Sequence, residues 1–144
     1  MRIPTLASLT VAGTLALPGA SPAQRRGAAC LPYEPDTVAI SGSLARKTFP
    51  GRPNYESIKD GDEPETGFYL ELRAPVCTIG SPDSTEDNNA SVEGIRLVQL
   101  VLDSAGYSRL RPHLGHQVTL RGTLFAAITG HHHAPLLLRV TSGP

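Results

Sequence analysis

Residues 119–141 constrain the fold more than any other part of the sequence. Apolar residues alternate with their neighbours on both sides of a short connection, which is the period of two half-buried strands. If the turn is centred on His131, Leu124 lies opposite Leu138, and a single register puts both apolar rows on one face. The sequence therefore predicts an antiparallel hairpin with a histidine-rich tip.

The N-terminal residues have the pattern of a secretory signal. Arg2 gives a positive start, an apolar run extends from Ile3 to Leu17, and small residues stand at Ser21 and Ala23, the two positions that a signal peptidase reads. The run is shorter than the roughly 20 residues that a membrane-spanning helix needs. We expect cleavage after Ala23, a periplasmic or secreted protein, and no transmembrane segment after cleavage.

The charge balance and the cysteines also bear on function. The sequence holds 13 basic and 13 acidic residues, and the signal removes only Arg2 and no acid. The mature chain therefore has no basic excess to neutralise several phosphates, which argues against nucleic-acid binding. In an exported chain, two lone cysteines predict a disulfide between Cys30 and Cys77 rather than a metal pair or free thiols.

Three strands are expected before the hairpin. Period-2 alternation predicts strands over 38–44 and 68–73, and a continuous apolar run over 91–102 predicts a central, bulged strand. Turn-forming residues over 49–65 predict a long loop between the first two strands. The polar residues of 80–90 predict a second loop on the surface.

One short helix completes the order. Asp103 or Ser104 can cap it, and Pro112 and Gly115 can break it up and end it. Strand, long loop, strand, strand, short helix, strand, strand is the order of an all-β, five-stranded OB-like antiparallel barrel with its helix between strands three and four. Another antiparallel barrel or a sandwich is the alternative. We expect a signal peptide over 1–23, an N-terminal lead-in over 24–36, and one OB-like barrel domain over 37–144.

The OB topology predicts where a ligand would bind. In that fold the loop between strands one and two and the loop between strands four and five flank one face, here 49–65 and 129–133. The expected ligand-binding residues carry cationic, amide, aromatic, acidic and imidazole groups, which suit sugars or carboxylates. They are Arg52, Asn54, Tyr55, Glu56, His131, His132 and His133. The structural alternative is that the aromatic rings pack the loop down and the histidines hydrogen-bond the loop backbone.

The histidines also allow a metal hypothesis. Alternate side chains of an extended segment share a face, so His131 and His133 are expected to converge while His132 points away. Two imidazoles need another ligand to hold Zn²⁺ or a similar ion, and Glu56 on the facing loop is the expected carboxylate. The other acids that could supply it are Asp60, Asp62 and Glu63.

Four segments together resemble a known family. They are Phe49-Pro-Gly-x-Pro-Asn-Tyr-Glu-Ser-Ile58, Val98-Gln-Leu-Val101, Gly122-Thr-Leu-Phe125 and Thr129-Gly-His-His-His133. In these segments the chain resembles the bacterial exported family called domain of unknown function 4431, over nearly the whole mature chain. The resemblance implies no activity, because the family has none assigned. Relatives often carry a histidine where this chain has Ile128, which removes one candidate metal ligand here.

We therefore expect an exported binding module with a ligand site between 49–65 and 129–133. The alternatives are a zinc or other transition-metal binding protein that uses the histidine turn, and a structural envelope domain without a ligand. The expected partner is a small molecule, a metal or an envelope component. The sequence contains no Gly-x-Ser-x-Gly, no His-Glu-x-x-His and no phosphate-binding glycine loop, so an enzyme, such as a hydrolase with a metal-bound water, is the weaker hypothesis and no catalytic residue is assigned.

Overall fold

The computed structural model describes residues 30–80 and 89–144. The predicted signal peptide and most of the predicted loop over 80–90 lie outside these residues. Within the described ranges, no helix has the length and apolar character needed to cross a bilayer.

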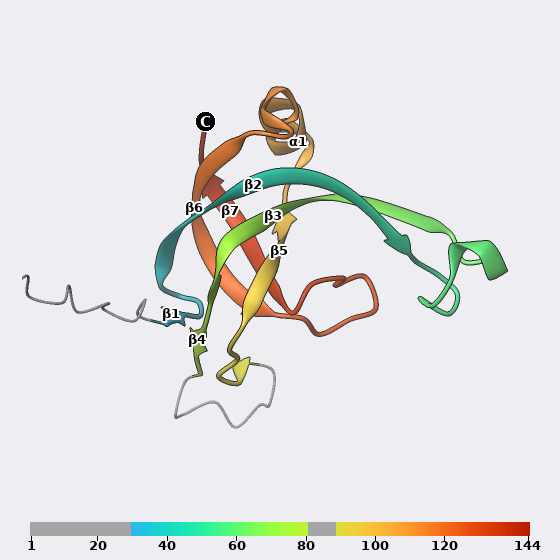
Figure 1. The fold of residues 1–144 in the computed structure, drawn as a ribbon, viewed down its shortest axis with the longest axis horizontal. Coiled ribbons are helices and arrows are strands. Elements are labelled where there is room, and N and C mark those ends of the chain that lie inside the picture. The colour runs from blue at the N-terminus through green and yellow to red at the C-terminus, as the bar shows by residue number, and fades with distance from the viewer. Residues whose placement is uncertain (1–29, 81–88) are drawn as a thin grey trace, which may run out of the picture.

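The described residues form a mostly β structure, as predicted (Figure 1). The strands are β1 (Leu31–Pro32), β2 (Thr37–Pro50), β3 (Pro64–Val76), β4 (Thr78–Ile79), β5 (Ile95–Val101), β6 (Gln117–Ala126) and β7 (Leu136–Ser142). The helical segments are the 3-10 turns η1 (Ile58–Asp60) and η3 (Arg111–His113) and the α-helix α1 (Ser104–Leu110). Five of the strands close into a barrel in the order β2-β3-β5-β7-β6.

One pair of barrel strands departs from the predicted antiparallel arrangement. β5 and β7 pair in parallel, whereas the other neighbouring pairs of the described barrel are antiparallel. Strand direction cannot alternate all the way round a ring with an odd number of strands. Closing five strands therefore requires at least one parallel pair, and the prediction of a wholly antiparallel barrel is wrong at β5 and β7.

The α1 helix follows β5 and precedes β6. This differs from the predicted place between strands three and four because the short strands β1 and β4, which the sequence does not predict, enter the count. They form a separate parallel sheet and are too short to show a hydrophobic period. The predicted cap is confirmed, since the Asp103 carboxylate accepts the Gly106 N–H at 2.6 Å, and Gly115, at φ 80°, follows η3.

The barrel interior is filled by aliphatic side chains from every barrel strand. The members that solvent does not reach are Leu44, Leu70, Val98, Leu120, Leu124, Leu136 and Leu138. The predicted hairpin register is confirmed, because Leu124 pairs with Leu138 across β6 and β7. Each buried leucine of this kind stabilises the fold by about 1.5–3 kcal/mol relative to an exposed one, so slipping this register by one residue would expose the row.

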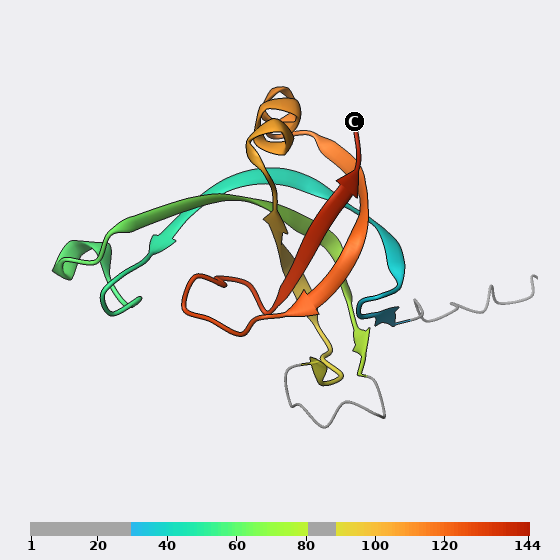
Figure 2. The same cartoon turned by 180° about the vertical axis from the view of Figure 1, so that it is seen from behind.

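The β2–β3 hairpin is longer than predicted. Pairing continues to Phe49 opposite Glu65 and Pro50 opposite Pro64, so the loop itself is 51–63 rather than 49–65. The sequence does not reveal the extension because the strands have left the barrel there, and polar side chains occupy both faces. The hairpin projects from the barrel on the same side as the connection between β6 and β7 (Figures 1 and 2).

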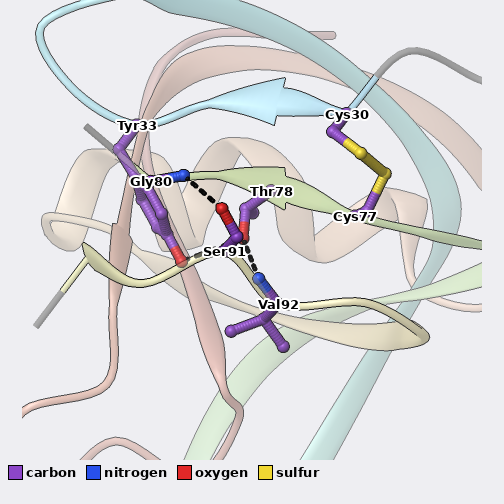
Figure 3. The surroundings of a disulfide bond; sticks show 7 residues. All are labelled: Cys30, Tyr33, Cys77, Thr78, Gly80, Ser91 and Val92. Atoms are coloured by element: carbon purple, nitrogen blue, oxygen red, sulfur yellow. Dashed lines mark hydrogen bonds between the residues drawn. A yellow bond between two sulfur atoms is a disulfide. The ribbon is translucent and has the colours of Figure 1, made fainter. Parts of the chain in front are cut away.

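The predicted disulfide between Cys30 and Cys77 is confirmed (Figure 3). It joins β1 to the end of β3, next to the pairing of β1 with β4. Beside it, the buried Tyr33 hydroxyl donates to the Ala90 carbonyl at 2.9 Å and hydrogen-bonds the Thr78 hydroxyl at 3.0 Å. The bridge and this side chain fix the N-terminal strand against the barrel.

Candidate ligand site at the histidine turn

The two outer histidines of the β6–β7 turn meet one carboxylate. His131 Nδ1 lies 2.6 Å from Oε1 of Glu65, and His133 Nε2 lies 2.8 Å from Oε2. The His133 side chain is 10% exposed and that of His131 is 47% exposed, so one contact is largely shielded and the other faces water. The predicted convergence of His131 and His133 is confirmed.

The middle histidine points away, as predicted. His132 Nδ1 accepts the N–H of Ile128 at 2.9 Å, and its ring lies edge-on to Phe125 with 5.7 Å between centroids. An accepting Nδ1 requires the proton to sit on Nε2 of the neutral ring. Burial first, and then the charges of His131 and His133, lower the pKa of His132 below its ordinary value.

Tyr55 connects the β2–β3 loop to the turn. Its hydroxyl lies 3.2 Å from His131 Nε2, and the two rings meet edge to face at 5.3 Å and 87°. Gly130 allows this approach, because a Cβ added there would lie 2.8 Å from the Tyr55 ring. The prediction that the 49–65 loop and the histidine turn lie on one face is confirmed by this contact.

A buried aspartate holds the loop that presents Tyr55. Asp62 is 4% exposed and accepts backbone N–H groups of Asn54, Glu56 and Ser57 at 2.8, 2.7 and 2.8 Å. The bond from Ser57 first, and that from Asn54 next, lower the pKa of Asp62. Tyr55 has φ 60°, a left-handed conformation that costs of order 1 kcal/mol or more, and these bonds on both sides of it maintain that conformation.

Glu65 occupies the place that was expected for Glu56. Arg52, Asn54 and Glu56 lie exposed on the 51–63 loop, and in the described part of the chain no hydrogen bond or ion pair joins their side chains to a histidine. Glu65 reaches the histidines because β3 extends to it. The only sequence feature that could have identified Glu65 was its position beside the start of a strand.

The Gln99 side chain, which the sequence analysis did not single out, fastens the backbone of the turn. Its Nε2 donates to the His131 carbonyl at 3.0 Å, and its Oε1 accepts the His133 N–H at 2.7 Å. Phe49, opposite Glu65 in the hairpin, stacks on the His133 ring at 5.0 Å and 8°. We call Phe49, Tyr55, Glu65, Gln99, His131 and His133 the histidine platform.

The platform adjoins a row of side chains on the outside of the barrel, where Phe49 packs on Tyr69 with 5.3 Å between ring centroids. Tyr69, Gln99, Leu137 and Phe125 are paired in register across β3, β5, β7 and β6. Tyr69 is 1% exposed and Leu137 is fully buried, although simple alternation puts Leu137 on the outer side. Burial first, and then the charges of Tyr107 and Glu65, raise the pKa of Tyr69 to about 12.

The platform carboxylate is ionised at neutral pH. Burial acts to raise the pKa of Glu65, but hydrogen bonds from His133 and His131, with the charge of both rings, outweigh it and lower the pKa. Gly51 lies against this carboxylate, since a Cβ there would come 2.5–2.7 Å from the Glu65 side chain. Because Gly51 has no side chain, the Glu65 carboxylate has the space to reach both histidines.

Glu65, His131 and His133 are residue types that bind metal ions, but in the structure they hydrogen-bond one another. Two imidazoles and a carboxylate are ligands that Zn²⁺ accepts. Across residues 30–80 and 89–144, no three or more His, Cys, Asp and Glu side chains stand in an arrangement that could hold a metal ion. A metal would have to replace the protons shared by Glu65 with His131 and His133.

Comparison with known proteins gives a match to a family model over part of the chain. No curated protein matches the chain. The segment that does match a family model begins within β5, at residue 97, and continues through α1, β6, the histidine turn and β7, so it includes Gln99 and all three histidines of the turn. Over residues 97–142 the chain matches the model of the family described as domain of unknown function (DUF4431).

Proposed function

We propose that the chain is an exported, OB-like binding module whose ligand site is the histidine platform. The barrel order β2-β3-β5-β7-β6 and the position of α1 before β6 support the OB-like assignment. The signal pattern at residues 1–23 supports export, and so does the Cys30–Cys77 bridge, because disulfides persist in oxidising compartments.

One observation carries the binding proposal. Glu65, at the edge of the β2–β3 hairpin, bonds both His131 and His133 of the β6–β7 turn, so two separate connections form one polar surface on the barrel. Rigid, preorganised polar groups of this kind bind ligands at low entropic cost. Both ring nitrogens of His131 are already bonded, to Glu65 and to Tyr55, so the Tyr55 oxygen is the atom of this pair that can accept a hydrogen bond from a small polar molecule. Arg52 and Asn54 on the adjoining loop extend the surface.

The proposal is tested by native mass spectrometry of untagged protein from the periplasmic or culture fraction. We expect wild type to retain a noncovalent small molecule or metal ion, and expect His131→Ala and Glu65→Ala to lose it. The matched control is His113→Ala in η3, away from the platform, which should retain the ligand. A wild-type spectrum that shows only the bare mature chain would contradict the proposal and favour a structural envelope domain.

A transition metal is the second candidate ligand. His131 Nδ1 and His133 Nε2 converge on one carboxylate, so Glu65 takes the place of Glu56 as the third ligand of the proposed site. Zn²⁺ bound there would accept the two imidazoles and Glu65 and leave a position open. Ligation needs neutral imidazole, so protons compete with the metal and its affinity should fall as the pH is lowered.

Calorimetric titration of Zn²⁺ into untagged protein tests the metal candidate. We expect His131→Ala, His133→Ala and Glu65→Ala each to abolish binding, whereas His132→Ala should have a smaller effect because its ring lies on the other side of the turn. Equal losses from all three histidine variants, or no heat from wild type at micromolar protein, would reject the metal site.

A further inference from the structure

A hollow in the surface shares no lining residue with the histidine platform. Its lining residues come from β2 and β3 where their hairpin leaves the barrel, from α1, and from η3 and the residue after it. Its volume is about 450 Å³, and its lining residues are Arg46, Thr66, Phe68, Tyr107, Arg111 and Leu114. Pockets that bind small molecules commonly have volumes of about 300–1,000 Å³.

One wall of the hollow is aromatic. The rings of Phe68 and Tyr107 meet edge to face at 5.0 Å and 69°, and Phe68 is buried while Tyr107 remains partly exposed. Leu114 adds an aliphatic surface. The pair therefore provides a fixed apolar face that can contact a ring or a short aliphatic chain.

The other wall is cationic and lacks a neutralising acid. Arg46 and Arg111 are both exposed, and within residues 30–80 and 89–144 neither forms an ion pair. The adjacent Lys47, by contrast, pairs with Glu71 at 2.6 Å. Two guanidinium groups at one hollow repel each other, and an anion between them would relieve that repulsion and accept forked hydrogen bonds.

A hydroxyl completes the polar side. Thr66 hydrogen-bonds Thr48 across the hairpin at 2.7 Å. Either hydroxyl can be the donor of this bond: when Thr48 donates, the Thr66 hydrogen is free to donate to a ligand, and when Thr66 donates, its oxygen can still accept. The hollow thus combines donors and positive charge on one side with apolar rings on the other.

We propose that this hollow binds a small organic anion. Its carboxylate or phosphate lies between Arg46 and Arg111, and its ring or aliphatic part contacts Phe68 and Tyr107. The site is independent of the histidine platform, so its presence does not depend on the function proposed above.

Titration of the mature chain, followed by ¹H–¹⁵N NMR, tests the site with four probes. Phenyl phosphate and benzoate carry both an anion and a ring, inorganic phosphate lacks the ring, and benzyl alcohol lacks the charge. We expect saturable binding of at least one of the first two, at lower concentration than either partial probe, and the tighter of the two identifies the preferred anion. No saturable shifts with either aromatic anion at millimolar concentration would overturn the proposal.

Variants locate the binding. Arg46→Gln and Arg111→Gln should each weaken binding of the better aromatic anion about tenfold or more, because each removes charged hydrogen bonds. Arg121→Gln on β6, an exposed arginine outside the hollow, is the matched control and should leave the affinity unchanged. An equal loss in Arg121→Gln, or no loss in either hollow variant, would show nonspecific charge attraction and overturn the site.

Discussion

At the scale of single residues, glycines decide whether the two loops can touch. A Cβ at Gly130 would lie 2.8 Å from the Tyr55 ring, so Gly130→Ala must push the ring away from His131. We expect the free energy of unfolding in urea to fall by about 1–2 kcal/mol, the usual cost of overpacking. In a Tyr55→Ala background the same substitution should cost little. An equal cost in both backgrounds would contradict the contact.

His132 predicts a pH dependence of stability. Folding lowers its pKa below 6.5, so between the folded-state pKa and 6.5 the unfolded chain binds more protons. The contribution of this group to stability is therefore complete above 6.5 and is lost as pH falls through the folded-state pKa. In His132→Asn an amide oxygen can accept the Ile128 N–H without titrating. Urea unfolding at pH 7 and pH 5.5 should show a smaller loss in the variant than in wild type, and equal losses would refute the assignment.

The directions of the histidine side chains could be predicted from the sequence, whereas their partners could not. Simple alternation separates His132 from His131 and His133, and the structure keeps that separation although His131 lies in a turn closed by the His132 N–H and the Thr129 carbonyl. The identity of the carboxylate depends on how far β2 and β3 continue as strands. Glu65 reaches the histidines through that extension, and Glu56 is held on the loop by its backbone bond to Asp62.

At the scale of elements, Gln99 fastens the histidine turn to β5. Gln99→Ala removes two hydrogen bonds to the turn backbone, which should lower the free energy of unfolding by about 1–2 kcal/mol. Hydrogen exchange at the His133 amide should accelerate in the variant, since that N–H loses its acceptor. The control is Gln117→Ala at the exposed start of β6. Unchanged exchange at His133 would show that the turn is held by other contacts.

The β6–β7 hairpin is the element that the sequence specifies best. The apolar residues of β6 and those of β7 face the same side of the hairpin in only one pairing register, so only that register buries both rows. The β2–β3 hairpin is specified less well. Beyond Leu44 and Phe68 its strands leave the core, and their length is set by backbone pairing and by the packing of Phe49 on Tyr69 and His133, which leaves no hydrophobic period in the sequence.

At the scale of the whole molecule, the disulfide limits the freedom of the unfolded chain. Cys30 and Cys77 are separated by 47 positions, and closing a loop of that size contributes about 4 kcal/mol in the chain-entropy account. We expect the paired change Cys30→Ala and Cys77→Ala to lower the free energy of unfolding by about that amount. Reductant should destabilise wild type and leave the paired variant unaffected. Similar stabilities of oxidised and reduced wild type would contradict this role.

The mostly β, five-stranded architecture could be predicted from the order of elements, because each barrel strand has its own apolar pattern. That at least one neighbouring pair is parallel could have been predicted too, since it follows from closing an odd number of strands, but parity alone does not identify β5 and β7 as that pair. The short β1–β4 sheet could not, because two-residue strands have no period and depend on the disulfide and Tyr33 beside them.

The central claim is that Glu65 joins the β2–β3 hairpin and the histidine turn into one platform. A double-mutant cycle of Glu65→Ala and His133→Ala tests it, with the free energy of unfolding measured in urea at pH 7. His133 is the better partner because its side chain is 10% exposed, against 47% for His131. We predict a coupling energy of at least about 0.5 kcal/mol, as for residues in direct contact, and additive effects for the control pair Glu65→Ala and His113→Ala. Additivity of Glu65→Ala and His133→Ala within about 0.3 kcal/mol would mean that the two loops are not joined there, and would contradict the account.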